Sequence, residues 1–152
     1  MTLPFILRDM TEQDVSYVHS SFLKSYHQHS IMKFVPNTIY YKNQEEIIHY
    51  LTKNANTLIA CFPEDPEEIM GYIIYEIVSD MLVLHWIQVK GIHMHMQLAT
   101  KIINSICPKD NCSIIATHIT FDYERLKTKI DNKKFSYDPF YIVNKRLNGH
   151  SR

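Results

Sequence analysis

The sequence predicts an α+β domain with a central, twisted, mostly antiparallel sheet of about six strands flanked by about four helices. A length of 152 residues, 45% of them hydrophobic and 21% charged, suits one domain with its own core. Strand-like and helix-like segments alternate along the chain, and no repeat or linker divides them. Three consecutive strand-like runs are joined by turns too short for a crossover, which favours an antiparallel meander. We expect one domain over residues 1–143 and a polar, basic tail over residues 144–152.

The amino-terminal third predicts a strand and two helices. The first strand is expected at residues 5–7. A helix should follow Thr11, because Thr11 and Asp14 resemble a capping box. Its apolar face follows helical spacing: Val15, Val18, Phe22 and Tyr26. Residues 28–41 are expected to form a long irregular connection of the kind that often lines a binding site. A second helix is predicted from Asn43, which has Glu46 three residues later.

The middle of the chain predicts the meander. Its strands are expected at residues 57–62, 69–78 and 81–89, separated by the turn signals Pro63-Glu64-Asp65-Pro66 and Ser79-Asp80. The third run is almost continuously apolar, as a central strand covered on both faces would be.

The carboxy-terminal part predicts two further helices and two strands. A helix is expected at residues 96–106, ended by Pro108, because proline cannot continue a helix. A strand at residues 113–120, a polar helix at 122–132 and an extended segment at 135–143 complete the prediction.

Composition excludes several classes of function. Sixteen basic residues balance sixteen acidic ones, so we predict no nucleic-acid partner. No run approaches the ~18 apolar residues of a membrane span, and no secretory signal is visible, so we predict a soluble protein without a membrane partner. Three cysteines are too few and odd in number for a disulfide framework, which indicates a reducing compartment. Three glycines in the whole chain exclude glycine-rich phosphate loops.

The order of elements, with three short strings, carries a resemblance to a known family. The strings are His85-Trp86-Ile87-Gln88-Val89-Lys90, Ala116-Thr117-His118 and Phe135-Ser136-Tyr137-Asp138-Pro139-Phe140. Together they resemble small phage-encoded members of the GNAT superfamily of acyl-coenzyme A N-acyltransferases. The resemblance implies the GNAT fold and, in active members, an acetyl-coenzyme A site.

The family's coenzyme loop has the form Arg/Gln-x-x-Gly-x-Gly/Ala, and here it falls on residues 94–99. Met94 replaces the Arg/Gln, Gln97 replaces the first glycine, and Ala99 matches. In the family, backbone N–H groups at this helix start bind the pyrophosphate. The resemblance therefore implies a degenerate coenzyme site whose contacts, if the protein is active, are Val89, Met94, Gln97, Leu98 and Ala99.

The family's catalytic groups have only partial counterparts. If the protein is active, the candidates for a general base are His85 and, on the preceding strand, Glu76. A packed, non-catalytic role for both remains open. Many members place a tyrosine in the helix after the fifth strand, to protonate the leaving thiolate. Here Ile130 stands at that place, and Tyr123, about two turns earlier, is not assigned the role.

Two other clusters have alternative interpretations. His93-Met94-His95 suggests a soft metal site, but no third ligand follows at a defined spacing, and we predict no metal. Tyrosines gather at residues 40–41 and 137–141, where they indicate either core packing or a protein interface.

Two hypotheses follow. The favoured one is a GNAT-fold pseudoenzyme without a cofactor, a structural or assembly component of a phage particle such as a tail or portal-proximal protein. It would self-assemble or bind protein partners, in a virion or a bacterial host cytoplasm. The alternative is an acyl-coenzyme A dependent N-acyltransferase that acts on a small-molecule or protein amine.

Overall fold

A six-stranded mixed sheet forms the centre of the protein in the computed structural model, which describes residues 4–91, 95–130 and 134–150. The strands lie side by side in chain order: β1 (Ile6–Asp9), β2 (Asn56–Phe62), β3 (Asp65–Val78), β4 (Met81–Val89), β5 (Ser113–Ala116) and β6 (Lys134–Tyr137). Neighbours from β1 to β4 are antiparallel, whereas β4–β5 and β5–β6 are parallel. The predicted class, the meander and the mostly antiparallel sheet are confirmed.

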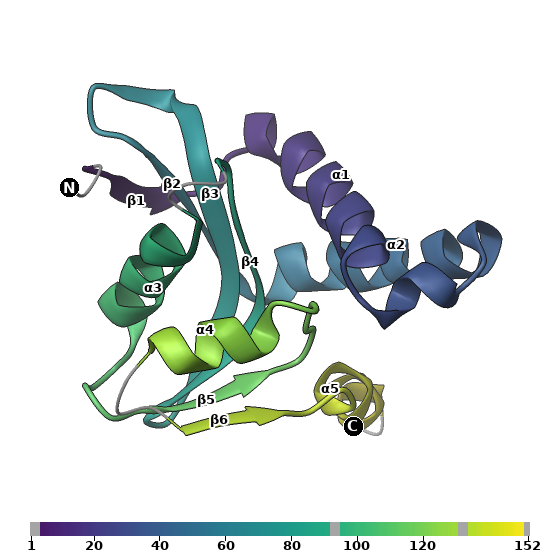
Figure 1. Ribbon diagram of the computed structural model, residues 1–152. Coiled ribbons are helices and arrows are strands. Elements are labelled where there is room, and N and C mark those ends of the chain that lie inside the picture. The colour runs from purple at the N-terminus through teal and green to yellow at the C-terminus, as the bar shows by residue number, and fades with distance from the viewer. Residues whose placement is uncertain (1–3, 92–94, 131–133, 151–152) are drawn as a thin grey trace.

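Helices cover both faces of this sheet (Figure 1). They are α1 (Glu12–Gln28), the 3₁₀ helix η1 (Ile31–Phe34), α2 (Asn37–Asn54), α3 (His95–Ile106), α4 (Tyr123–Lys129) and α5 (Tyr141–His150). Helices α1 and α2 lie on one face, and α3 and α4 lie on the other. No helix in the described ranges is long and apolar enough to span a bilayer.

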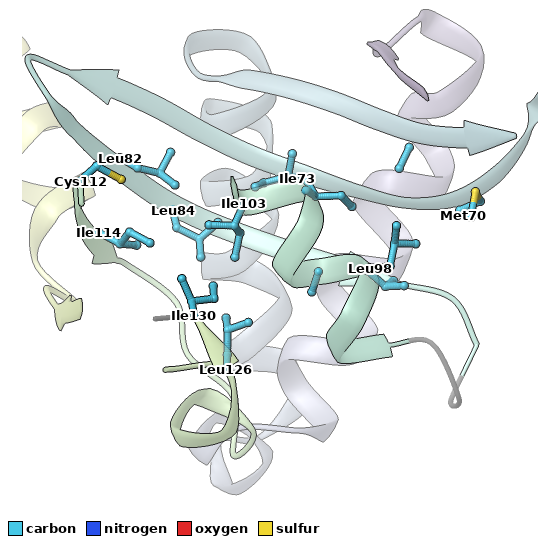
Figure 2. Packing of buried hydrophobic residues seen from close by; sticks show 14 residues of the cluster. Met70, Ile73, Leu82, Leu84, Leu98, Ile103, Cys112, Ile114, Leu126 and Ile130 are labelled. Atoms are coloured by element: carbon cyan, nitrogen blue, oxygen red, sulfur yellow. The ribbon is translucent and has the colours of Figure 1, made fainter. Parts of the chain in front are cut away.

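Each face has its own hydrophobic core. Under α3 and α4, the core includes Ile73, Leu84, Ile103, Ile114 and Leu126, whose side chains converge in Figure 2. The core under α1 and α2 is rich in aromatic residues and also receives Ile142 of α5: its largest members are Phe22, Tyr26, Tyr40, Tyr72 and Trp86. The β-strand alternation of side chains assigns successive residues of β3 and β4 to these two cores.

The start of α1 confirms the predicted capping box. The Thr11 side chain and the Asp14 side chain each bond to the other residue's backbone. Asp14 also accepts two hydrogen bonds from the Arg8 guanidinium, at 2.7 and 3.0 Å. Because Arg8 belongs to β1, this ion pair ties the first strand to the first helix.

The predicted start of the second helix at Asn43 is wrong. Helix α2 begins at Asn37, and the Pro36 carbonyl accepts the N–H groups of Ile39 and Tyr40 at 3.0 and 2.9 Å. Asn43 lies inside the helix, and its amide donates to the Ile39 carbonyl at 2.8 Å. Proline suits a helix start because its φ is already close to the helical value. The expected irregular connection is therefore only the short stretch around η1.

The carboxy-terminal predictions need three corrections. Strand β5 ends at Ala116, not at residue 120, and α4 spans Tyr123–Lys129, not residues 122–132. The segment predicted as extended to residue 143 is extended only in β6, and α5 includes residues assigned to a polar tail. Asp138 accepts the Phe140 N–H at 3.0 Å, which helps to start this helix.

Candidate functional site

The parallel strands β4 and β5 separate at one end of the sheet. They pair from Met81 with Ser113 to Leu84 with Ala116. One further bond joins them, from the Thr117 N–H to the Leu84 carbonyl at 3.0 Å. Strand β4 then continues to Val89, while the chain after Thr117 leaves the sheet toward α4. The divergence leaves the β4 edge beyond His85 without a strand partner on this side among the described residues.

A small cavity, open to solvent at one side, lies between the diverging strands. Helices α3 and α4 complete its wall. Most of the lining is apolar, and the polar groups gather on the segment that leads into α4. The lining residues are Leu84, Trp86, Ile87, Val89, Ala99, Ala116, His118, Ile119, Thr120, Asp122, Tyr123 and Leu126. A small apolar slot with a few polar groups at one side is typical of ligand sites.

A β-bulge in β4 lies where the strands separate. Ile74 of β3 pairs with Trp86, but the next residue, Tyr75, pairs with Leu84. His85 is therefore an extra residue on β4, and a bulge of this kind re-aims the side chain that it carries. The His85 ring is fully buried and contacts Glu76 and Thr117.

Four side chains form one hydrogen-bonded chain. Glu76 Oε2 lies 2.7 Å from His85 Nε2, His85 Nδ1 lies 3.0 Å from Thr117 Oγ1, and Thr117 Oγ1 lies 2.9 Å from His118 Nδ1. At its outer end, Glu76 Oε1 forms an ion pair with Lys145 of α5. The His85 hydrogen bond lowers the pKa of Glu76, burial opposes this, and Lys145 lowers it further. Glu76 is therefore a carboxylate at neutral pH.

His118 lies at the inner end of this chain and lines the cavity. Its ring packs against Phe22 and Tyr26 of α1, with ring centroids 5.5 and 4.9 Å away. Burial is the main reason that its pKa falls to about 3, and the neighbouring His85 lowers it as well. His118 is therefore neutral at physiological pH.

Tyr123 is the first residue of α4 and also lines the cavity. Burial raises the pKa of its phenol, and the adjacent Glu124 raises it further. The hydroxyl therefore keeps its proton at neutral pH and is a potential donor. Ile130, which takes the family tyrosine's place in the sequence, is buried in the core.

The predicted coenzyme contacts separate into three groups. Val89 and Ala99 line the cavity. Leu98 is buried in the core beneath α3, and Gln97 is exposed on that helix. Met94 lies outside the described residues, as does His93 of the possible metal site. No group of three potential metal ligands from His, Cys, Asp and Glu occurs among the residues that are described.

The predicted catalytic pair is brought together, but away from the cavity wall. His85 and Glu76 are bonded to each other, and neither lines the cavity. Thr117 and His118 extend the pair to the cavity, although neither residue was a site candidate on sequence. Their sequence signal is weak, because Thr-His at a strand end has no motif attached to it.

The two tyrosine clusters differ in burial. Tyr40 is buried and its hydroxyl donates to the Leu23 carbonyl at 2.6 Å, so the first cluster belongs to the core. In the second, Tyr137 is 41% and Phe140 66% exposed. The stretch at residues 28–41 contributes no described residue to the cavity wall.

Comparisons with solved structures identify the fold. A possible acetyltransferase from Clostridium difficile 630 matches over 88% of this chain and 93% of its own, with a TM-score of 0.56 and 9% identity. A provisionally assigned acetyl transferase from Pyrococcus furiosus matches over 95% and 91%, with a TM-score of 0.50 and 11% identity. No protein-family model and no curated protein matches the sequence significantly.

A further solved structure matches over a shorter range. It is a provisionally assigned GNAT-family acetyltransferase from Desulfovibrio desulfuricans, with a TM-score of 0.43 and 14% identity. The match spans 68% of this chain and 63% of that protein. The Clostridium and Pyrococcus matches cover most of the chain, and they show that it shares the fold of these two proteins.

Proposed function

We propose that this protein transfers an acyl group from a coenzyme A thioester to an amine, the alternative that the sequence left open. The observation that carries the proposal is the cavity between the diverging ends of β4 and β5. It combines an apolar slot with the open edge of β4. Tyr123 in its wall and the neighbouring Glu76–His85 pair are groups that can transfer protons. The acetyltransferase folds matched above agree with this reaction class.

The cavity suits the slender arm of a coenzyme A thioester. Leu84, Ile87, Val89 and Ala99 offer apolar contacts to an acyl group and its methylene chain. The arm also carries amide groups, and the open edge of β4 offers backbone N–H and C=O groups to pair with them. Gln97 is exposed at the first turns of α3 and does not fill this slot.

The thioester supplies an activated acyl group, and residues of this chain supply position and proton transfer. The amine nitrogen forms a bond to the acyl carbon, the carbon–sulfur bond breaks, and the amine loses a proton. Tyr123 protonates the leaving thiolate: this residue lines the cavity, and its hydroxyl retains its proton at neutral pH. The Glu76–His85 pair stabilises the amine's proton once it leaves the cavity.

Calorimetric titration with acetyl-coenzyme A tests the proposal directly. We expect a Kd on the order of micromolar for the wild-type protein, followed by thiol release when an amine panel is added. Thr120→Trp should block binding because Thr120 lines the cavity, whereas Thr128→Trp should bind normally because Thr128 is exposed on α4. Absence of binding and thiol release in the folded wild-type protein would overturn the proposal.

A second candidate is the structural or assembly component of a phage particle that the sequence favoured. Such a component needs a protein interface, and exposed apolar side chains at helical spacing near and on α5 would suit one: Phe140 is 66%, Val143 50% and Leu147 62% exposed. Light scattering would give the mass of the protein in solution. A discrete multimer that binds no acetyl-coenzyme A would favour this role over acyl transfer.

A further inference from the structure

We propose that His118 takes the proton of the acceptor amine and passes it through Thr117 to the His85–Glu76 pair. This inference rests on the proposed acyl transfer, and it assigns His118 as the base that meets the amine. Thr117, His85 and Glu76 act through His118 as positioning residues. The role predicted for His85 thereby changes from direct base to proton store.

The geometry supplies a continuous path from the cavity to the ion pair between Glu76 and Lys145 of α5. His118 is the member of the path that lines the cavity. Each of the three contacts from His118 through Thr117 and His85 to Glu76 measures between 2.7 and 3.0 Å, so every step lies within hydrogen-bond distance. The bulge at His85 turns this ring toward both Glu76 and Thr117. Glu76 belongs to β3, and Thr117 directly follows β5.

The proton balance of the relay is simple. The amine proton enters at His118 Nε2, and the proton on Nδ1 moves to Thr117 Oγ1. The Thr117 hydroxyl proton moves to His85 Nδ1, while His85 Nε2 keeps its own proton against Glu76. His118 and Thr117 end neutral, and His85 ends as an imidazolium paired with a carboxylate. After the product leaves, the proton returns along the same path and passes to solvent from His118 Nε2 through the cavity, which restores every group to its starting state.

The surroundings explain why His118 needs the relay. Its ring lies against Phe22 and Tyr26 on α1, where a positive charge is poorly solvated. Burial and His85 lower its pKa to about 3, so it can receive a proton only briefly. Two other titratable residues line the same cavity: Asp122, just before α4, and Tyr123, its first residue.

The receiving end of the relay is built to hold positive charge. Glu76 lies 2.7 Å from His85, and its carboxylate is 14% exposed. Tyr141 of α5 packs on the His85 ring with 5.8 Å between ring centroids, and Lys145 of the same helix pairs with the other oxygen of Glu76. A carboxylate between an ammonium and an imidazolium stabilises both. The proton therefore moves from an apolar site to an ion-paired one.

Thr117→Val and Thr117→Ser form the matched test. Valine removes the hydroxyl and keeps the branched shape, whereas serine keeps the hydroxyl. We expect Thr117→Val to lower kcat about 10- to 100-fold with the KM for acetyl-coenzyme A nearly unchanged, and Thr117→Ser to restore most of kcat. When kcat/KM is plotted against pH, the acid limb should move to lower pH in Thr117→Val. The reason is that His118 then accepts a proton without passing it on to the His85–Glu76 pair. A purely structural Thr117 would leave the position of that limb unchanged.

Histidine side-chain NMR gives a readout that needs no turnover. Glu76→Gln should change the His118 ring nitrogen shifts through the relay, and it should fail to do so in the Thr117→Val background. If the wild-type protein neither binds nor transfers, the proposed function and the relay both fail. If it transfers acyl groups but Thr117→Val retains its kcat and pH profile, or Glu76→Gln leaves the His118 shifts unchanged, the relay alone is overturned.

Discussion

Asp14→Asn gives a stability prediction whose size follows from the geometry of one carboxylate. Asp14 is 5% exposed and accepts two hydrogen bonds from Arg8 and two from Thr11. The Arg8 hydrogen bonds are the largest cause that lowers its pKa from 3.8 to about 2, against the opposing effect of burial. At about 1.36 kcal/mol per pKa unit, the ionised carboxylate contributes about 2.5 kcal/mol to the free energy of unfolding.

The sign of the pH dependence follows from this lowered pKa. Because the folded pKa lies below the unfolded one, the contribution is fully present above pH 3.8 and is lost as the pH falls through about 2. Near pH 3 the unfolded state binds most of a proton that the folded state does not, so the stability from this group should change by about 1 kcal/mol per pH unit. The amide that Asp14→Asn introduces cannot titrate, so the variant should lack this slope.

Urea unfolding of the wild-type protein and of Asp14→Asn, at pH values from 7 to 2, measures the effect. We expect the variant to be about 2 kcal/mol less stable at pH 7 and the two curves to converge below pH 3. Glu12→Gln, on the exposed side of the same helix turn, is the matched control and should shift stability by less than about 0.5 kcal/mol. If the free energies of unfolding of the two proteins differ by the same amount at every pH, the lowered pKa of Asp14 does not arise from its contact with Arg8.

Two further substitutions test the sheet and the cavity. Gly71→Ala should cost about 1–2 kcal/mol in urea unfolding, because its Cβ would lie 2.5 Å from the Gln88 carbonyl and 3.0 Å from the Val89 Cα, both backbone atoms; a variant as stable as the wild type would show that β3 and β4 are not so close. Tyr123→Phe should lower kcat about 10- to 100-fold and leave the Kd for acetyl-coenzyme A within about two-fold, since it removes only the proton donor. An unchanged kcat would show that another group or water protonates the thiolate.

Local signals predicted the parts of the fold that local interactions determine. The capping box at Thr11 and Asp14 is formed, because both of its hydrogen bonds lie within one helix turn. The three strands predicted for the meander also match β2, β3 and β4 to within a few residues at their ends. Helix α2 starts after Pro36 and not at Asn43, so the proline was the stronger start signal of the two. Asp138-Pro139 is a similar start signal before α5.

The candidate site was predictable only in part. Residue type and strand position identified His85 and Glu76, and the structure brings the two within 2.7 Å. Thr117 and His118 gave no comparable signal, because their importance depends on where β5 ends. The sequence assigned Tyr123 no role, and only the position of α4 brings it to the cavity wall.

The sequence by itself determined the class of fold, the strand meander and the types of residue available for chemistry, because periodicity, capping and turn signals act over a few residues. The tertiary structure decided how these residues work together. A one-residue bulge at His85 and the divergence of two parallel strands after Leu84 join Glu76, His85, Thr117 and His118 into one path beside one cavity. Such a juxtaposition depends on a contact between residues 32 positions apart, His85 and Thr117, for which hydrophobic periodicity along the chain carries no information.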